Sequence, residues 1–315
     1  MRDVPAYRVS FCGMSALVLL LGGVFVLTGC ANQSFKQVGA SILSSTGIVS
    51  STQAEGLLGA GANLVESQQS LTAEQEYYLG RAVSANLLET YKPVTKSGTM
   101  KYLNQVGMTI ASVSDLPETF GGYHFALVES DQINAFAAPG GFIYVSTGFV
   151  RRLPDEDSLA AVLAHEVAHV NFKHGVSAIS NAKLFSALGE FTKQGASIAG
   201  SRVGAPVELA SLTNMLAESA TGVTDKLLRS GFDRSQEYQA DLYAAQLLER
   251  AGYDPNALVR VLKILQESQA DDAQGWYATH PAPKKRISEL EDEFDFTPPR
   301  EGHPERKARF TRTMK

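Results

Sequence analysis

The chain has 315 residues, of which 44% are hydrophobic and 19% are charged. This composition is typical of a globular protein and excludes a chain that is disordered along most of its length. The formal net charge of −5 argues against nucleic acid as the main partner, because phosphate binding needs a basic surface.

The chain begins with a segment typical of a signal peptide, which we assign to residues 1–29. Arg2 and Arg8 flank a short polar start, and an apolar stretch from Val9 to Leu27 follows. It ends in Leu27-Thr28-Gly29-Cys30, which resembles the lipobox of bacterial lipoproteins. The resemblance implies cleavage before Cys30 and lipidation of its thiol, and several acyl chains would anchor the protein stably. The alternative is an uncleaved transmembrane helix, which the interruptions in the apolar stretch disfavour.

Cysteine usage agrees with a lipoprotein of the cell envelope. Cys12 would leave with the signal peptide and Cys30 would be acylated, so no free thiol would remain in an oxidising compartment. Ala31 stands where lipoproteins retained in the inner membrane usually carry Asp, so the resemblance implies the outer membrane, with the protein facing the periplasm. Residues 30–70 are rich in Ser, Gly, Ala and Gln and predict a flexible tether.

The folded domain is expected over residues 71–294. Its first helix should run from a capping box at Thr72 to about Thr90, and a second from about Thr99 to Val113. Alternating β-branched and aromatic residues predict strands at Tyr123–Glu129 and Gly141–Thr147. A helix that is apolar on nearly all sides follows and is expected in the core. Further helices are predicted at 181–193, 206–220, 235–251, 255–269 and 283–294.

Two segments allow more than one interpretation. Residues 182–231 are rich in Ala, Ser and Gly, and they fit either a helical insertion that acts as a lid or plain packing. Charged residues interrupt each apolar run there before it reaches membrane length. Residues 295–315 are basic and could touch anionic lipid, but a disordered, solvated tail is the main prediction.

The chemistry is expected on the core helix, where His165-Glu166-Val167-Ala168-His169 forms an HExxH motif. Histidines four residues apart project from one face of a helix, so both can hold one zinc ion. Glu166 lies beside that face and can take a proton from water, whose pKa zinc lowers. The alternative is a chance match on a surface helix, which the nearly uncharged surroundings disfavour.

A third ligand is sought near Glu237 and Asp241, which are four residues apart on a predicted helix. Glu237 can complete the zinc site, and Asp241 can accept the outer N–H of a zinc histidine. Spacing alone would favour the alternative, an ordinary exposed acidic face. His174 is a weak candidate, because on a continuous helix it lies about 140° around from His169. A position at the helix end, or beside a ligand, is expected for it instead.

Four motifs together resemble the HtpX and CAAX prenyl-protease family of gluzincin zinc metallopeptidases. They are Asn134–Gly141, the HExxH motif, Glu237-x-x-x-Asp241 and Thr279-His280-Pro281, and they follow the family's order over roughly residues 70–292. The resemblance is closest to the periplasmic lipoprotein branch that includes BepA and LoiP. It implies one zinc ion per chain, held by His165, His169 and Glu237.

The expected fold is α+β, a mostly helical zincin-like domain with a small sheet whose edge strand lies above the active-site helix. Asn134, Ala135 and Phe136 should lie on or beside that edge, where an extended peptide can add by main-chain hydrogen bonds. Alternatively, Asn134 is only a turn residue and Phe136 a core residue. His280 is expected either to donate a hydrogen bond to the oxyanion or to reach the open metal position, and otherwise to be an ordinary loop histidine.

The expected function is that of a zinc metalloendopeptidase of the bacterial cell envelope. The family resemblance implies misfolded or unassembled envelope proteins as substrates, including precursors of outer-membrane β-barrels. The alternative is an envelope chaperone or outer-membrane assembly factor whose proteolysis is weak or normally repressed. The same edge strand would then bind its clients without cutting them.

Overall fold

The computed structural model describes residues 71–177, 220–268, 276–280, 283–294 and 303–315, together with residues 217 and 296. The predicted signal peptide and tether, and nearly all of the Ala-, Ser- and Gly-rich stretch, lie outside these residues. Within the described part of the chain, no helix combines the length and apolarity needed to cross a membrane.

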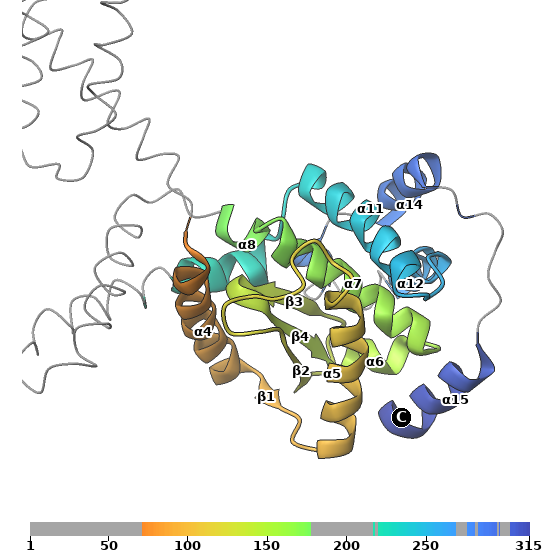
Figure 1. Ribbon diagram of the computed structural model, residues 1–315, viewed down its shortest axis with the longest axis horizontal. Coiled ribbons are helices and arrows are strands. Elements are labelled where there is room, and N and C mark those ends of the chain that lie inside the picture. Colours follow the sequence, from red (N-terminus) through yellow and green to blue (C-terminus); the bar gives the residue numbers. More distant parts are fainter. Residues whose placement is uncertain are drawn as a thin grey trace, which may run out of the picture. The chain divides into compact units, whose positions relative to one another are not determined.

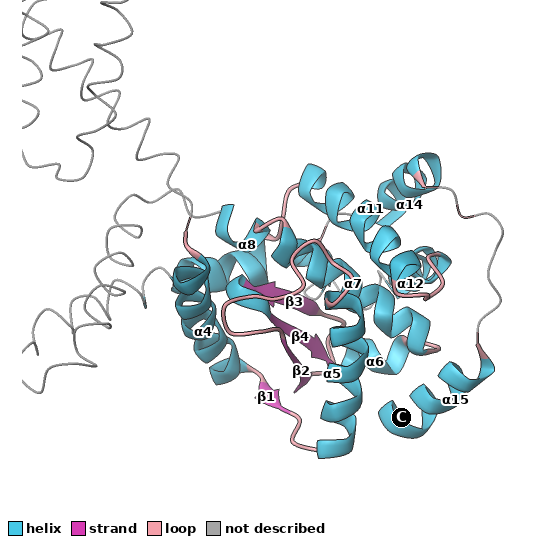
Figure 2. Ribbon diagram, viewed as in Figure 1, coloured by secondary structure: helices cyan, strands magenta, loops and turns pink. Residues whose placement is uncertain are grey.

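A small mixed sheet forms one layer of the domain (Figures 1 and 2). Its strands are β1 (Lys92–Pro93), β2 (His124–Glu129), β3 (Ala135–Ala138) and β4 (Phe142–Ser146). Their order is β1-β2-β4-β3, with β4 parallel to β2 and antiparallel to β3. Among the described residues β3 is therefore an edge strand, as predicted.

The turn η1 (Pro139–Gly141) reverses the chain between β3 and β4. Gly140 has a φ of 75°, in the left-handed region where a side chain would strain the backbone. A side chain there would also meet the backbone of Tyr77, because its Cβ would lie 2.8 Å from the Cα of that residue. The glycine thus allows the first helix of the domain to pack directly on the turn.

Helices surround the sheet, and the five that begin at residues 73, 97, 234, 256 and 283 agree with predicted helices to within about two residues at each end. The helix predicted to end at residue 220 is different, because residues 220–230 are still helical. The helices include α4 (Ala73–Thr90), α5 (Ser97–Ala111), α6 (Thr147–Arg152), α7 (Glu156–Asn171), α8 (His174–Ser177), the π-helical η2 (Lys226–Ser230), α11 (Arg234–Arg250), α12 (Asn256–Glu267), α13 (Trp276–Thr279), α14 (Pro283–Glu293) and α15 (Pro304–Met314).

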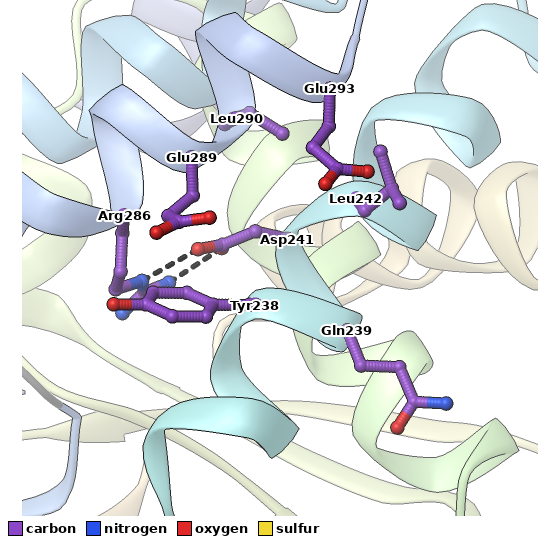
Figure 3. A pocket seen from close by; sticks show the side chains of 8 residues that line it. All are labelled: Tyr238, Gln239, Asp241, Leu242, Arg286, Glu289, Leu290 and Glu293. Carbon is purple, nitrogen blue, oxygen red and sulfur yellow. Dashed lines mark hydrogen bonds and ion pairs between the residues drawn. The ribbon is translucent and has the colours of Figure 1, made fainter.

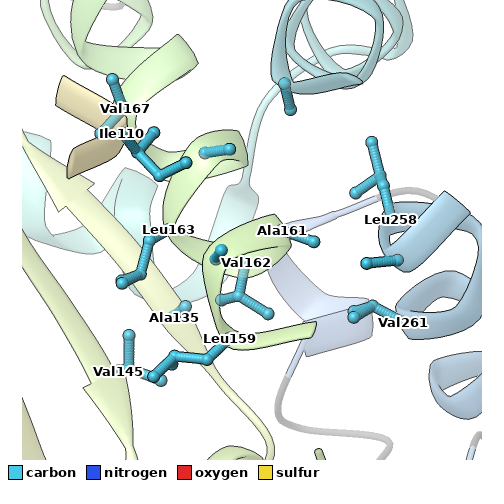
Figure 4. Packing of buried hydrophobic residues seen from close by; sticks show 14 of the residues in the cluster. Ile110, Ala135, Val145, Leu159, Ala161, Val162, Leu163, Val167, Leu258 and Val261 are labelled. Carbon is cyan, nitrogen blue, oxygen red and sulfur yellow. The ribbon is translucent and has the colours of Figure 1, made fainter. Parts of the chain in front are cut away.

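Helix α7 lies at the centre of the domain, between the sheet and the pair α11 and α12 (Figure 1). Every residue from Glu156 to Val170 is buried, which confirms the prediction of a core helix. Figure 4 shows Leu159 and Leu163 near the sheet residue Val145, while Val162 extends toward α12. Packing on several sides fixes the helix, and with it any side chain that performs chemistry.

The prediction of a disordered C-terminal tail is wrong for residues 304–314, which form α15. Phe310 is completely buried in the main core. Arg309 binds Glu156 through its Nε at 2.6 Å, and Arg306 binds Asp157 at 2.8 Å. These two acids are buried in the first turn of α7. The basic composition suggested solvation, but the helical spacing places both arginines and Phe310 toward one partner.

Candidate metal centre

Helix α7 presents His165 and His169 from one face, as the four-residue spacing predicts. Both rings are about 1% exposed, and their Nε2 atoms lie 3.1 Å apart. Burial lowers the pKa of His169 well below its ordinary value. For His165, burial is outweighed by hydrogen bonds to Asp241 and Glu237, which raise the pKa to about 9, so binding of a metal ion at this ring must displace a proton.

Glu237 completes the set from α11, where it stands in the first turn after a capping box formed by Asp233 and Gln236. Its Oε2 lies 3.6 Å from Nε2 of His165, and its Oε1 lies 3.5 Å from Nε2 of His169. Neighbouring ligands of a tetrahedral zinc ion with bonds of about 2.1 Å are roughly 3.4 Å apart. The three side chains therefore have both the chemistry and the spacing of zinc ligands.

His280 is a fourth member of this cluster, and the ligand atoms of all four residues lie within 4.8 Å of one another. Its Nδ1 is 2.8 Å from Oε1 of Glu237. The ring is only 3% exposed and stacks on Trp276, with 3.8 Å between centroids. His280 follows α13 in a loop, as predicted, but it is buried within the site, unlike an ordinary surface-loop histidine.

A tight backbone contact holds this loop against the site. Gly231 has a φ of 65°, and a Cβ there would lie 1.9 Å from the carbonyl oxygen of Thr279. The next residue, Phe232, donates its backbone N–H to the same oxygen at 3.2 Å and stacks its ring on His169 at 4.1 Å. The segment before α11 thus contacts both a zinc histidine and the loop of His280.

Asp241 accepts from the outer nitrogen of His165, with 3.0 Å between its Oδ1 and Nδ1. Arg286 in turn binds both oxygens of Asp241, at 2.7 Å and 2.6 Å (Figure 3). Its Nη1 also lies 2.8 Å from Oε2 of Glu237. Burial opposes ionisation of Glu237, but the charges of His280 and Arg286 outweigh it and hold the pKa of Glu237 well below its usual range.

Sequence reasoning missed Arg286, although a clue was present. The residue stands on the predicted helix at 283–294 together with Ile287 and Leu290, so it is a cation on the apolar face. A cavity of about 360 Å³ between α11 and α14 is lined by Asp241 and Arg286 but not by the histidines of the cluster (Figure 3). It therefore borders the partners of the metal ligands, not the ligands themselves.

His174 is not among the clustered ligands, in agreement with the sequence prediction. It opens α8 and lies beside a ligand, with its Nδ1 2.9 Å from Nδ1 of His169. Its other nitrogen, Nε2, is 3.2 Å from Oε1 of Gln239. On a continuous helix His174 would lie about 140° around from His169, but α7 ends at Asn171 and the chain turns back before His174.

Glu166 lies next to the metal ligands but has no partner of its own. Both carboxylate oxygens are buried, and neither has a hydrogen-bond partner among the described residues. Burial raises the pKa of this carboxyl to about 7. A carboxylate that is free to bind and titrates near neutral pH is suited to take up and release a proton.

The predicted substrate-binding residues fall in and beside β3. The main chain of Asn134 pairs with Ser146, since its carbonyl accepts the Ser146 N–H at 2.9 Å and its N–H reaches Oγ at 3.0 Å. In an antiparallel ladder the pairing alternates, so Ala135 and Ala137 direct their main-chain groups to the outer edge. Phe136 is a core residue, 3% exposed and stacked with Tyr144. This was the alternative interpretation for Phe136.

Comparison with known proteins agrees with this site. Residues 97–294 match the sequence model of peptidase family M48. The beta-barrel assembly-enhancing protease of Yersinia pestis is 30% identical over 264 residues, which cover 79% of this chain and 52% of the relative. Its namesake in Escherichia coli (strain K12) is 30% identical over 191 residues, or 60% of this chain and 37% of the relative.

A mitochondrial relative matches as well. The mitochondrial metalloendopeptidase OMA1 of Schizosaccharomyces pombe is 28% identical over 208 residues, which cover 65% of this chain and 55% of the relative. The chain therefore spans about half, or less, of the length of these curated relatives.

Proposed function

The chain belongs to peptidase family M48 and is a zinc metallopeptidase, and from that premise we propose that it cleaves unfolded envelope proteins as an endopeptidase. The observation that carries the proposal is the position of Glu166. This buried carboxylate has no partner among the described residues and lies on α7, which also carries two of the three zinc ligands and packs against the edge strand. This arrangement brings a base, a metal site and a peptide-binding edge together.

The chemistry divides between the metal and Glu166. Zinc, when bound at His165, His169 and Glu237, polarises the scissile carbonyl and lowers the pKa of water. Glu166 takes the proton from the attacking water and passes it to the leaving amine, since a pKa of about 7 allows transfer in both directions. Asp241 keeps the proton of His165 on Nδ1, which leaves Nε2 free for the metal.

Substrate is proposed to bind along β3 as an added strand. Ala135 and Ala137 direct main-chain groups to the edge, but they are 0% and 3% exposed, so this edge must be uncovered before a peptide can pair with it. The side chain of Asn134 has a buried Oδ1 without a partner among the described residues. Main-chain pairing recognises an extended conformation more than a particular sequence. A protein that is already folded presents few such segments, so unfolded or unassembled chains fit this edge best.

For His280 the geometry favours the role of a metal-site blocker in the resting enzyme. Its ring lies among the ligand atoms, and its Nδ1 is 2.8 Å from Oε1 of the ligand Glu237, so it can reach the metal position. This proximity also favours the second candidate function, an assembly factor whose proteolysis is normally repressed. In this proposal the enzyme is repressed while His280 occupies the metal position and becomes active when His280 moves away from it.

The cellular setting is proposed from the N-terminal sequence and from the names of relatives. Leu27-Thr28-Gly29-Cys30 supports a lipoprotein of the periplasmic branch, anchored by Cys30 to the outer membrane and facing the periplasm. Two relatives are called beta-barrel assembly-enhancing proteases, which supports outer-membrane β-barrel precursors among the substrates.

The test is cleavage of a urea-unfolded β-barrel precursor by the purified full chain, with and without chelator. Wild type, Glu166→Gln and His280→Ala should all contain zinc. We expect slow cleavage by wild type, none by Glu166→Gln and faster cleavage by His280→Ala, because the metal position is then open. Binding without cleavage by wild type and by zinc-loaded His280→Ala would favour the assembly factor and overturn the peptidase proposal.

A further inference from the structure

The two zinc histidines have different outer partners. Nδ1 of His165 faces a carboxylate, that of Asp241, at 3.0 Å. Nδ1 of His169 faces another imidazole nitrogen, Nδ1 of His174, at 2.9 Å. A hydrogen bond between two ring nitrogens requires a proton on one and a bare lone pair on the other.

The zinc site determines which ring holds the proton. His169 offers Nε2 to the cluster, so as a neutral ring it must keep its proton on Nδ1. Nδ1 of His174 must therefore be bare, and its proton must reside on Nε2. That nitrogen faces Oε1 of Gln239 at 3.2 Å, and an amide oxygen is an acceptor. Each ring therefore donates to the next residue: His169 donates to His174, and His174 donates to Gln239.

We propose that His174 and Gln239 form a relay that fixes the tautomer and the orientation of His169, so that both act as positioning residues for zinc. Neither residue touches the metal or the substrate. The proposal depends on the zinc site and not on which proteins the enzyme cleaves, so either can fail without the other.

The turn after α7 holds the ring of His174 in place beside His169. Lys173 adopts a φ of 55° directly after α7, a conformation that non-glycine residues rarely take, and this turn directs the chain back toward His169. Its Nζ pairs with Glu76 of α4, which ties the turn down. The ring of His174 is 3% exposed and stacks against Phe172, with 5.6 Å between centroids. It is therefore held on both its packing and its hydrogen-bonding sides.

Helix α11 supplies the other end of the relay. Gln239 stands two residues after the metal ligand Glu237 on α11, so the same rigid element positions both. A shift of α11 relative to α7 would disturb the ligand and the relay together. The two zinc histidines are thus oriented by side chains from one helix, with Asp241 serving His165 and Gln239 serving His169 through His174.

The first test reads the tautomers directly in the zinc-loaded full chain. Six histidines are present, so two-bond proton–nitrogen spectra of protein labelled with ¹⁵N-histidine remain simple to assign by single substitutions. The relay requires the proton of His169 on Nδ1 and that of His174 on Nε2. A His174 ring protonated on Nδ1 would overturn the proposal, whatever the activity of the protein.

The second test measures zinc affinity by competition with a chelator for His174→Asn and His174→Phe. Asn places an acceptor oxygen where Nδ1 stands, whereas Phe keeps the ring and its packing but accepts nothing. We expect His174→Phe to bind zinc about 10–100-fold more weakly and His174→Asn to stay within roughly threefold of wild type. Equal affinities in the two variants would show that His174 only fills space and would overturn the relay.

Gln239 provides a third test that leaves both histidines in place. Gln239→Leu removes the final acceptor, so the Nε2–H of His174 loses its partner and the ring its orientation, and zinc binding should weaken by up to about tenfold. Gln239→Glu restores an acceptor and should restore the zinc affinity. Gln236→Glu adds the same charge one turn earlier and keeps a side chain that can form the capping box, so it controls for charge alone. A zinc affinity of Gln239→Leu equal to that of the wild type would remove Gln239 from the relay.

Discussion

Replacing Arg286 by Met should destabilise the zinc-free protein more than almost any other single change at the site. The guanidinium is about 1% exposed and lies within 2.8 Å of oxygens from Glu237 and Asp241. Met preserves much of the apolar stem but removes the charge. Two buried carboxylates would then lose the cation that they share.

The size of the stability loss expected for Arg286→Met follows from the burial of the ion pair. An exposed ion pair contributes at most about 1 kcal/mol, because water screens it. Removing one member of a buried pair costs roughly 3–5 kcal/mol, because the remaining charge has no compensation. Exposures of 0% and 2% for the side chains of Glu237 and Asp241 place this contact in the second class. Against a total stability of about 5–15 kcal/mol, the loss is large.

The stability difference between wild type and Arg286→Met should depend on pH in a definite direction. Burial opposes ionisation of Glu237 and Asp241, but in each case the nearby positive charge outweighs it and lowers the pKa. A lowered pKa stabilises the fold above the ordinary carboxyl range near 4, and this stability is lost as the pH falls through the lowered value. Without Arg286 both carboxyls lose the cation that they share, so the pKa of each rises and the folded protein takes up protons at a higher pH. The gap between wild type and variant should therefore be widest at neutral pH and narrow below about pH 5.

Urea unfolding of the chelator-treated proteins, followed by circular dichroism from pH 4 to 8, checks this reasoning. Arg286→Met combined with Asp241→Asn should lose less than the two single changes together, because one unpaired charge is removed. Arg151→Met is the control for an exposed pair, since the side chains of Arg151 and its partner Asp131 are 57% and 99% exposed. A loss below about 1 kcal/mol for Arg286→Met, or a gap independent of pH, would refute the buried-pair argument.

Glu166→Gln should retain stoichiometric zinc and lose about 10²–10⁴-fold in cleavage rate, and normal turnover in the zinc-loaded variant would exclude it as the base. Glu237→Ala should lose zinc on dialysis, whereas Asp241→Ala should weaken it only about 10–100-fold; metal analysis separates the two, and full zinc in Glu237→Ala would exclude that ligand. Cys30→Ser should leave the membrane fraction while the purified domain stays active, unless the protein survives a carbonate wash in that fraction. Phe310→Ala should lower the stability to urea by about 3–5 kcal/mol, and an unchanged midpoint would mean that α15 does not pack.

Sequence patterns predicted the fold well where all the residues that carry the signal lie within one helix or strand. The apolar positions around His165 on every side of the helix indicated a core helix, and α7 is buried over almost its whole length. The capping box at Thr72 marked the start of α4. The spacing of Glu237 and Asp241 indicated one helical face, and both carboxylates now face the zinc histidines.

Pairings between distant elements could not be obtained in this way. Arg286 is 45 residues from Asp241 in the sequence, and only the packing of α14 on α11 brings them together. His174 was judged on a helix that in fact ends before it. The arginines of α15 appeared solvated because their partners, buried acids at the start of α7, lie about 150 residues earlier in the chain.

Charge balance explains why the two zinc histidines have different partners. Among the described residues, the buried charges of the site are three carboxylates, those of Glu166, Glu237 and Asp241, and one guanidinium, that of Arg286. A divalent ion brings the sum to zero when all three acids are ionised, and a buried site is least costly when its charges cancel. A carboxylate in place of His174 would add a fourth negative charge. A neutral imidazole relay orients His169 without disturbing this balance, so the asymmetry between the two histidines follows from the electrostatics of the site as a whole.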